Sequence, residues 1–350
     1  MSKIALITDQ HFGVRGDNLQ FHEYYRKFYN ECFFPEIEKR NIKTVVELGD
    51  IFDRRKYINF DSLSRCRSYF FDPLKEKDIS LHCIVGNHDI YFKNTNRVNA
   101  PELLLDGYDN VTVYEKAEDV GFQGATLLFV PWISPDNYDH TMETIQNSNA
   151  RFVLGHLEFQ GFEMYRGAVI DHGYSHKIFS QFDLVMSGHY HHKSSKDNVV
   201  YLGSPYEMTW SDYDDPRGFH IFDTETGDLE YIQNPFNMFH KVFYDDSEQT
   251  NIMDYDFSDL KDTYVKVVVK EKNNPYIFDL FIDRLNASGP IHVQVVEDNL
   301  NLDLGDENEI IDEAEDTITI INKYISNLSL QDSKPVVQLL NDLYYEALSA

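Results

Sequence analysis

Five short polar clusters in this sequence each follow a run of apolar residues. They are Asp9-Gln-His11, Gly49-Asp50, Gly86-Asn-His-Asp89, Gly155-His156 and Gly188-His-Tyr-His191. A single histidine or aspartate at a strand end is more often a cap or a satisfied polar group than a functional residue. Loops at the carboxyl ends of the strands of an α/β sheet converge on one crevice, however. All five clusters together therefore predict one shared site.

The residue types in these clusters are typical of a catalytic metal site. Carboxylate, imidazole and amide ligands without cysteine suit Mn, Fe or Zn in a hydrolytic site rather than a structural zinc. The candidate ligands are Asp9, His11, Asp50, Asn87, His156, His189 and His191. These are too many for one ion, but if Asp50 bridges, each of two ions receives four protein ligands. Such ions lie roughly 3.5 to 4 Å apart and promote in-line displacement at phosphorus.

His88 and Asp89 are the candidate catalytic residues outside the ligand set. His88 adjoins the ligand Asn87, so we expect it to stabilise transition-state charge or to protonate the leaving group. We expect Asp89 to orient His88. The histidines outside the clusters are interpreted as structural or exposed, with His192 open because it adjoins the last cluster.

The elements that must position these clusters begin with a βαβαβ pattern. Residues 3–8, 44–48 and 80–85 have the length and β-branched content of buried strands. Residues 19–40 and 61–77 have helical length, although Pro73 should kink or divide the second helix. This order predicts a parallel, buried sheet in an α/β fold. Further strands are predicted at residues 111–114, 126–130, 151–154, 183–186 and 199–202.

The pattern changes near Asp214, which suggests a second domain. A hairpin is predicted around residues 224–228, followed by strands at 264–270 and 291–296 that enclose a helix at 275–286. We therefore assign residues 1–213 to a first domain that contains all five clusters and residues 214–296 to a small α/β second domain. Residues 297–308 read as an acidic linker, and residues 309–350 contain two amphipathic helical stripes.

Composition places the chain among globular intracellular proteins. It has 350 residues, of which 42% are hydrophobic and 26% charged, and no apolar run approaches the roughly 18 residues of a membrane span. Three cysteines without a CxxC pair fit a reducing compartment. We expect a cytoplasmic protein with no signal peptide and no membrane partner.

The net charge restricts the ways in which nucleic acid can bind. The chain has 31 basic and 59 acidic residues, a net charge of −28. Residues 1–100 carry 16 basic and 14 acidic side chains, so the rest carries 15 − 45 = −30. Tight, unaided DNA binding is disfavoured, because lysine and arginine supply most of that affinity. Binding to DNA would need bound metal, a basic partner protein, or a local basic patch such as Arg54, Arg55 and Lys56. The alternative is that the negative charge only keeps the protein soluble.

The ordered clusters resemble the calcineurin-like metallophosphoesterases, whose pattern is DxH, GD, GNH[DE], H and GHxH, over about residues 1–205. Within that superfamily the chain is similar to the SbcD-type DNA nucleases of double-strand-break repair, with which it shares GDIF at 49–52 and GSP at 203–205. GHLEFQGFEMYRG (155–167) and DPRGFHIFDTET (215–226) resemble the exonuclease subunits of tailed phages. Many cellular relatives have a histidine where this chain has Asp53, so we expect Asp53 to pair with Arg54 or Arg55 instead.

The resemblance implies a layered fold of β sheets flanked by helices, with a capping domain and a C-terminal helical tail. It also implies how the metals are shared. One ion would be held by Asp9, His11, Asp50 and His191, and the other by Asp50, Asn87, His156 and His189. The ions would be Mn²⁺, with Mg²⁺ as the alternative. The implied partners are DNA, a second copy of the chain, and an SMC-like ABC ATPase bound by the C-terminal helices, which together form a heterotetramer.

Three classes of function are compatible with these residues. The first is a metal-dependent DNA exonuclease and endonuclease that acts with an ATPase in end processing, recombination, repair and replication. The second is a phosphatase or small-molecule phosphodiesterase on the same catalytic core. The third is a scaffold with an inactive site, which the complete ligand set disfavours. We favour the first class, and cleavage of DNA by the purified protein with Mn²⁺ separates it from the second.

Overall fold

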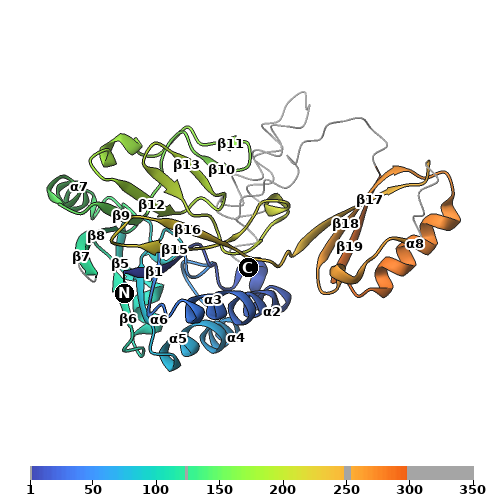
Figure 1. Cartoon of the computed structure of the whole chain (residues 1–350), viewed down its shortest axis with the longest axis horizontal. Coiled ribbons are helices and arrows are strands. Elements are labelled where there is room, and N and C mark those ends of the chain that lie inside the picture. The colour runs from blue at the N-terminus through green and yellow to red at the C-terminus, as the bar shows by residue number, and fades with distance from the viewer. Residues whose placement is uncertain (1, 123–124, 248–253, 298–350) are drawn as a thin grey trace, which may run out of the picture. The chain divides into compact units, whose positions relative to one another are not determined.

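Two six-stranded sheets form the centre of the catalytic part of the chain. The computed structural model describes residues 2–122, 125–247 and 254–297 (Figure 1). The first sheet has the order β16-β15-β1-β2-β3-β6 and the second the order β13-β14-β12-β9-β8-β7. Their facing strands share one hydrophobic cluster, in which Leu6 and Val46 of the first sheet pack with Leu154 and Met186 of the second. The predicted layered α/β fold is confirmed.

The strands of the first sheet are β1 (Lys3–Ile7), β2 (Thr44–Glu47), β3 (Ser80–Ile84), β6 (Val111–Tyr114), β15 (Gly218–Asp223) and β16 (Leu229–Gln233). Those of the second are β7 (Glu118–Phe122), β8 (Ala125–Val130), β9 (Phe152–His156), β12 (Leu184–Gly188), β13 (Ser194–Lys196) and β14 (Val199–Tyr201). The strands β1, β2, β3 and β6 of the first sheet run parallel, as do β8, β9, β12 and β14 of the second. The carboxyl ends of each parallel set therefore lie along one edge.

One expected domain boundary is corrected by strand pairing. The hairpin around residues 224–228 forms as predicted, but its strands do not belong to the small second sheet. β15 pairs antiparallel with β1, and β16 pairs with β15, so both extend the first sheet. Their partner strand is distant in sequence, and nothing in residues 218–233 alone indicates it. The small sheet begins at Phe239 rather than near Asp214.

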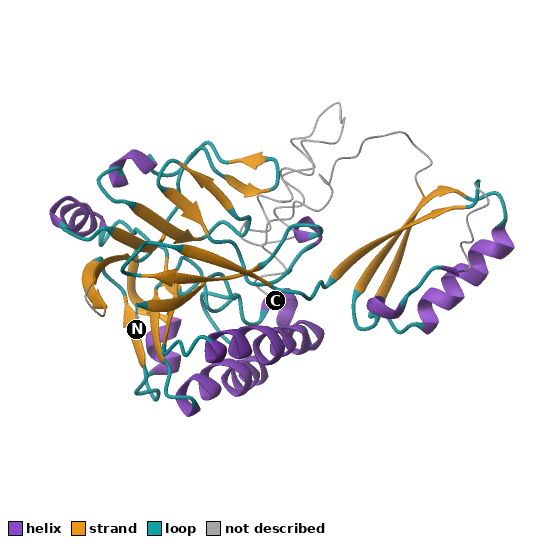
Figure 2. Ribbon diagram, in the orientation of Figure 1, coloured by secondary structure: helices purple, strands orange, loops and turns teal. Residues whose placement is uncertain are grey.

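Helices cover the outer face of the first sheet (Figure 2). They are α2 (Leu19–Phe28), α3 (Phe34–Lys39), α4 (Phe60–Cys66) and α5 (Asp72–Glu76). A π-helical turn joins α2 to α3 at Tyr29–Phe33, and another joins α4 to α5 at Arg67–Phe71. Pro35 and Pro73 are each the second residue after these turns. A proline ring clashes with the carbonyl one turn earlier, and the wider π turn accommodates it. The helix therefore continues through Pro73 instead of being divided.

Shorter elements complete the catalytic part. They are α1 (Val14–Asp17), α6 (Ala100–Leu105), α7 (Tyr138–Asn147), the hairpin strands β4 (Ile90–Phe92) and β5 (Thr95–Asn99), the hairpin strands β10 (Glu163–Tyr165) and β11 (Ala168–Val169), and the 3-10 turns His176–Phe179 and Trp210–Asp212. Ile145 of α7 packs in the cluster on the outer face of the second sheet. Both sheets are thus covered on their outer sides.

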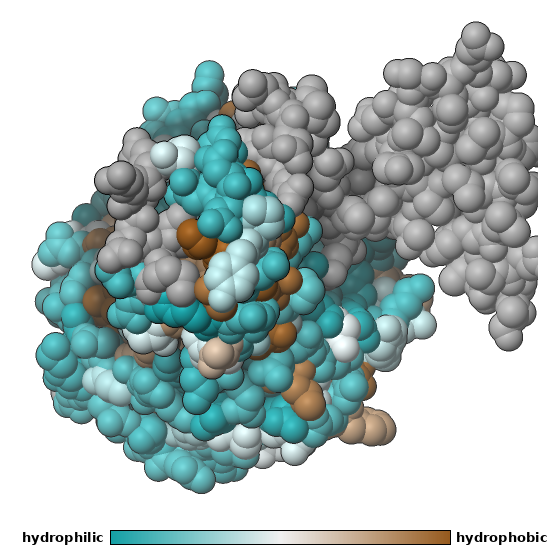
Figure 3. Space-filling view, turned by 90° about the vertical axis from the view of Figure 1, so that its right-hand side faces the viewer, coloured by the Kyte–Doolittle hydropathy of each residue, from teal (hydrophilic) through white to brown (hydrophobic). Residues whose placement is uncertain are grey.

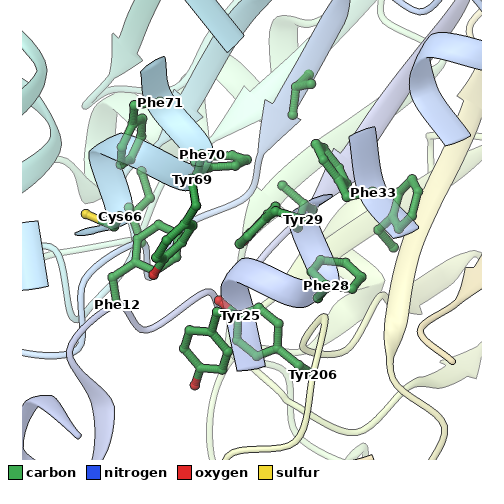
Figure 4. Packing of buried hydrophobic residues seen from close by; sticks show 14 of the residues in the cluster. Phe12, Tyr25, Phe28, Tyr29, Phe33, Cys66, Tyr69, Phe70, Phe71 and Tyr206 are labelled. Atoms are coloured by element: carbon green, nitrogen blue, oxygen red, sulfur yellow. The ribbon is translucent and has the colours of Figure 1, made fainter. Parts of the chain in front are cut away.

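The core beneath the helices is rich in aromatic side chains (Figure 4). The ring of Phe12 has centroid distances of 5.7 Å to Tyr69 and 6.0 Å to Phe71. Tyr69, Phe70 and Phe71 are at most 3% exposed, so they are core residues. Phe12 directly follows His11 and forms a β-bridge with Phe52, which lies close to Asp50 in sequence. This aromatic packing fixes the two loops that carry the first candidate ligands.

The capping elements form a separate small layer. The parallel strands β17 (Phe239–Asp245), β18 (Tyr264–Glu271) and β19 (His292–Glu297) pair in that order, and α8 (Pro275–Ala287) packs on one face through a shared hydrophobic cluster. A 3-10 turn lies at Ser258–Leu260. Asn274 caps α8 by accepting hydrogen bonds from the backbone of Tyr276 and Ile277. The predicted acidic linker, apart from its first residue, and the C-terminal helices lie outside the described residues.

The described surface is mainly hydrophilic on the face drawn in Figure 3, where hydrophobic side chains form small, separate patches. Among residues 2–122, 125–247 and 254–297, no helix combines the length and apolar character that a membrane crossing requires.

Glycines allow the loops of the two sheets to approach closely. A Cβ atom on Gly188, at the end of β12, would lie 1.9 Å from Thr8 Oγ1 and 2.9 Å from the Leu48 carbonyl oxygen. A Cβ atom on Gly49 would lie 2.3 Å from His156 Nδ1. Neither glycine can carry a side chain without moving a neighbouring loop.

We predict that Gly188→Ala destabilises the protein by about 1–3 kcal/mol, because the added methyl group overpacks this junction. Gly107→Ala is the matched control, since an added Cβ there meets nothing within 4 Å. Urea unfolding of the two variants measures the difference. Equal stability would show that the junction relaxes freely.

Candidate metal centre

The seven predicted ligands converge from both sheets onto one edge. Asp9, His11, Asp50 and Asn87 follow strands of the first sheet, whereas His156, His189 and His191 lie at the ends of β9 and β12 in the second. Two groups of ligand atoms each lie within 4.8 Å of one another: Asp9 with His11 and His191, and Asp50 with His156 and His189. The predicted convergence of these distant clusters is therefore present, and their roles as ligands stay predictions.

In the first group, two imidazole rings face each other. His11 Nε2 lies 3.1 Å from His191 Nε2, and His191 Nε2 lies 3.9 Å from Asp9 Oδ1. Two ring nitrogens at this separation need a proton or a metal ion between them, since two lone pairs repel. The nitrogen and oxygen donors fit a divalent ion of the Mn, Fe or Zn type.

In the second group, Asn87 and Asp50 face two histidines. His156 Nε2 lies 3.0 Å from Asn87 Oδ1 and 3.3 Å from Asp50 Oδ2. His189 Nδ1 lies 2.9 Å from the same Asn87 oxygen. Asp50 Oδ2 also lies 3.8 Å from His11 Nε2 in the first group. One carboxylate is thus within reach of both groups, as a bridging ligand must be.

Backbone groups orient several of these side chains. His156 Nδ1 lies 2.7 Å from the Leu48 carbonyl oxygen, which can only accept, so Nδ1 carries a proton and Nε2 is the nitrogen that a metal can bind once Nε2 has lost its own proton. The backbone N–H of His189 donates to both oxygens of Asp9 at 3.1 Å. The Thr8 hydroxyl donates to Asp9 Oδ2 at 2.8 Å. These contacts fix the ligand atoms before any ion binds.

The electrostatics of the site favour a cation. Burial alone would lower the pKa of His11, but Asp53, Asp50 and Asp9 together raise it to about 9. Burial likewise opposes charging of His156, and the neighbouring Asp50 and Asp9 raise its pKa to about 9. At neutral pH both rings therefore carry a second proton, and with it a positive charge, in the metal-free protein. A divalent ion must displace them, so metal affinity increases as the pH rises toward 9.

Four of the ligand residues have strained backbone conformations. The φ angles are 52° at Asp9, 44° at His11, 61° at Asp50 and 88° at His189, all in the left-handed region that favours glycine. Strain of this kind persists only where the surroundings impose it, and it is concentrated at functional sites.

The contacts of His88 and Asp89 differ from the expected ones. His88 Nδ1 lies 2.7 Å from the Asp53 carbonyl oxygen, so the backbone of Asp53, not the Asp89 carboxylate, orients the ring. Asp89 accepts backbone hydrogen bonds from Asp50 at 2.9 Å, Ile51 at 3.1 Å and Gly86 at 2.9 Å. Asp89 therefore joins the loop that contains Asp50 to the loop that contains Asn87. The motif GNHD does not indicate this role.

The basic cluster beside the site is also arranged differently from the prediction. Arg54 pairs with Asp17 at 3.0 Å rather than with Asp53, and Asp53 Oδ1 lies 3.5 Å from His11 Nδ1. Arg55 is half-buried; burial lowers its pKa, and the negative charge of Asp50 opposes that shift. Lys56 is exposed. Contact of these three residues with DNA stays a prediction.

Arg217 supports the last ligand loop and was not identified as a site residue from sequence. It is 5% exposed and donates to the His191 carbonyl oxygen, to Ser204 Oγ at 3.0 Å, and to Asp212 Oδ1 at 2.7 Å. Asp215 lies 2.9 Å from Arg217 and 2.8 Å from His192 Nδ1. Arg217 and its partner Asp215 both lie in the motif DPRG (215–218), which could have indicated this buried ion pair. An arginine close to aspartates usually forms an ion pair on the surface, however.

Comparison with known proteins defines the class to which this site belongs. Residues 2–193 match the calcineurin-like phosphoesterase family, and the chain belongs to that family. It is 33% identical to "Exonuclease subunit 1" of Enterobacteria phage T4, an alignment that covers 99% of each protein. It is 24% identical to the SbcD subunit of the nuclease SbcCD from Staphylococcus epidermidis, over 79% of this chain and 78% of that protein. The corresponding protein of Staphylococcus saprophyticus is 23% identical over 84% and 77%. The family resemblance predicted from the clusters is confirmed.

We predict that Asp50→Asn abolishes stoichiometric binding at both metal positions, because its Oδ2 atom is within reach of both ligand groups. Metal analysis of protein desalted after incubation with Mn²⁺ should fall from two ions per chain to nearly none. Asp61→Asn, a side chain 59% exposed on α4, is the control and should retain both ions. Retention of one full equivalent by Asp50→Asn would contradict the bridging role.

Proposed function

We propose that this protein is the nuclease component of a DNA end-processing system and hydrolyses phosphodiester bonds with two divalent metal ions. The observation that carries the proposal is the convergence of two ligand groups around the carboxylate of Asp50. The names of the relatives, an exonuclease subunit and two nuclease subunits, support DNA as the substrate.

Each part of the site has a defined task in this proposal. Two divalent ions, held by the ligand groups around Asp50, would supply charge neutralisation at the phosphate and would activate water for in-line attack. His88 keeps Nδ1 on the Asp53 carbonyl, so Nε2 is left to stabilise transition-state charge or to protonate the leaving oxygen. Arg55 contributes positive charge for the DNA backbone next to the cleaved bond, and Asp89 holds the ligand loops in register.

We propose Mn²⁺ as the ion, with Mg²⁺ as the second candidate. Each site combines imidazole nitrogens with carboxylate or amide oxygens. Oxygen-only sites favour Mg²⁺, and imidazole ligands shift the preference toward transition metals.

His88→Gln is expected to lower the rate of DNA hydrolysis by about 100-fold or more, because a general acid or charge stabiliser contributes that much. Its two metal ions should remain bound, since Asn87 Oδ1 contacts the ligand histidines His156 and His189, whereas His88 Nδ1 is held by the Asp53 carbonyl oxygen. The assay measures single-turnover cleavage of labelled DNA with Mn²⁺, beside metal analysis. Loss of metal in proportion to activity would assign His88 to the ligand set.

Hydrolysis of p-nitrophenyl esters by the wild-type protein without any cleavage of DNA would favour the phosphatase alternative.

We also propose that the protein works with an SMC-like ABC ATPase, bound through residues 309–350, and as a homodimer within a heterotetramer in the cytoplasm. The net charge of −28 supports a need for additional positive surface. The word "subunit" in the names of the relatives supports an assembly of several chains. The three cysteines are free, which supports a reducing compartment.

Truncation after Asp306 should abolish binding of the ATPase without removing metal or the cleavage of single-stranded DNA. All candidate ligands precede Gly203 in the sequence, so the truncated chain keeps the complete site. Co-purification with the ATPase and a salt series of duplex binding measure the effect. If the truncated protein still binds the ATPase, or if the full-length protein alone binds duplex DNA tightly near physiological salt, the proposed partner contact is wrong.

A further inference from the structure

A cavity of about 250 Å³ lies beside the second ligand group and has no role in the metal chemistry described above. Trp132, from the loop after β8, lines it together with Glu158 and Tyr174. His156, one of the predicted ligands, is also part of its wall. The ring of Trp132 lies 5.1 Å from that of His189, centroid to centroid. The cavity therefore adjoins the position where a phosphodiester would be cleaved.

The aromatic walls of the cavity are held by backbone hydrogen bonds. The N–H of Trp132 donates to the Val85 carbonyl at 2.8 Å, and its own carbonyl accepts from the Asn96 side chain at 2.8 Å. The N–H of Tyr174 donates to the Glu158 carbonyl at 2.8 Å. Gly173, at φ 94°, brings the chain so close that an added Cβ atom would lie 2.6 Å from the Glu158 oxygen. The cavity is thus formed before a ligand arrives.

The chemistry of the walls selects a flat ring with N–H groups. Trp132 and Tyr174 offer aromatic faces on which any base can stack. The Glu158 side chain also lines the cavity, and its Oε1 atom lies 3.7 Å from His189 Nε2 and 3.4 Å from His172 Nε2. A carboxylate carries negative charge and only accepts hydrogen bonds. Carboxylates accept from the exocyclic amino groups of bases. The same negative charge repels a phosphate, which belongs at the neighbouring metal centre.

The size of the cavity limits what it can hold. Clefts for drug-sized ligands begin at roughly 300 Å³, and 250 Å³ therefore suits one ring system rather than a base pair. A base can enter only after it has separated from its partner and from the stack.

We propose that this cavity binds the unpaired base of the nucleotide whose phosphodiester bond is cleaved. The inference rests on the proposed nuclease function and adds a structural reason for preferring single-stranded or frayed DNA. Trp132 is the residue on which the base stacks, and Glu158 is the acceptor for its N–H groups.

The chain contains two tryptophans, which allows a direct test. Trp210 is not part of the cavity wall and packs on Phe239 with a centroid distance of 4.8 Å, so Trp210→Phe leaves Trp132 as the single tryptophan fluorophore. In the presence of Mn²⁺, dAMP and dCMP should quench this protein saturably, whereas 2-deoxyribose 5-phosphate should not. The matched Trp132→Phe variant, which retains Trp210, should show no quenching. Equal quenching by the sugar phosphate, or quenching of Trp210 alone, would overturn the proposal.

Cleavage of DNA provides the second readout. The wild-type protein should cut a single-stranded oligonucleotide with a normal terminal base with a kcat/KM roughly tenfold higher than one with an abasic residue there, as expected for loss of one stacked base. One substrate carries the abasic residue at its 5′ end and another carries it at its 3′ end, so that both polarities of digestion are tested. In Trp132→Ala this ratio should fall to about one, and in Trp210→Phe it should persist.

Equal cleavage of normal and abasic substrates by the wild-type protein would contradict the cavity's role. Failure of the metal-loaded wild-type protein to cut any DNA would instead contradict the proposed function. The nucleotide titration would then still decide whether the cavity binds a base.

Discussion

The structure depends on the burial of several carboxylates in one small volume. Asp9, Asp50 and Asp89 are at most 2% exposed and lie where the two sheets meet. Burial of like charges is costly unless each is paired or hydrogen-bonded. The surroundings satisfy this requirement in three ways. Backbone N–H groups saturate Asp89, histidines hold the pKa of Asp50 well below its usual value despite burial, and the N–H of His189 supports Asp9. Two divalent ions would complete the same balance of charge.

The strained ligand loops follow from this requirement. A left-handed residue at Asp9, His11 and Asp50 turns the chain sharply at a strand end, so that the side chain points into the site. The aromatic core holds these turns from below, because Phe12 and Phe52 directly continue two of the loops and are at most 2% exposed. Packing of the aromatic core directly beneath the ligand loops thus maintains the geometry of the ligands.

The sequence predicted the parallel strands and the ligand clusters because both depend on local pattern. Apolar runs ended by polar residues locate β1, β2, β3, β9 and β12, and the structure places each within a few residues of the expected range. The pairing of β15 with β1 was missed, since it is a contact between residues far apart in sequence. For a similar reason, Asp89 was assigned the wrong role and Arg217 was not identified at all. Their function lies in hydrogen bonds to distant backbone atoms, which no spacing of residue types encodes.

The position of β1 has a consequence for how the enzyme is made. This strand carries Asp9 and His11 at its end, yet it lies between β2 and β15, and β15 begins at Gly218. His156, His189 and His191 belong to the other sheet and are also translated after the first half of the catalytic part. A ribosome must therefore deliver nearly the whole catalytic region before the sheets can close and the ligands can meet. Incomplete chains lack an assembled centre, and a potentially destructive activity is withheld from the cell until synthesis of that region is finished.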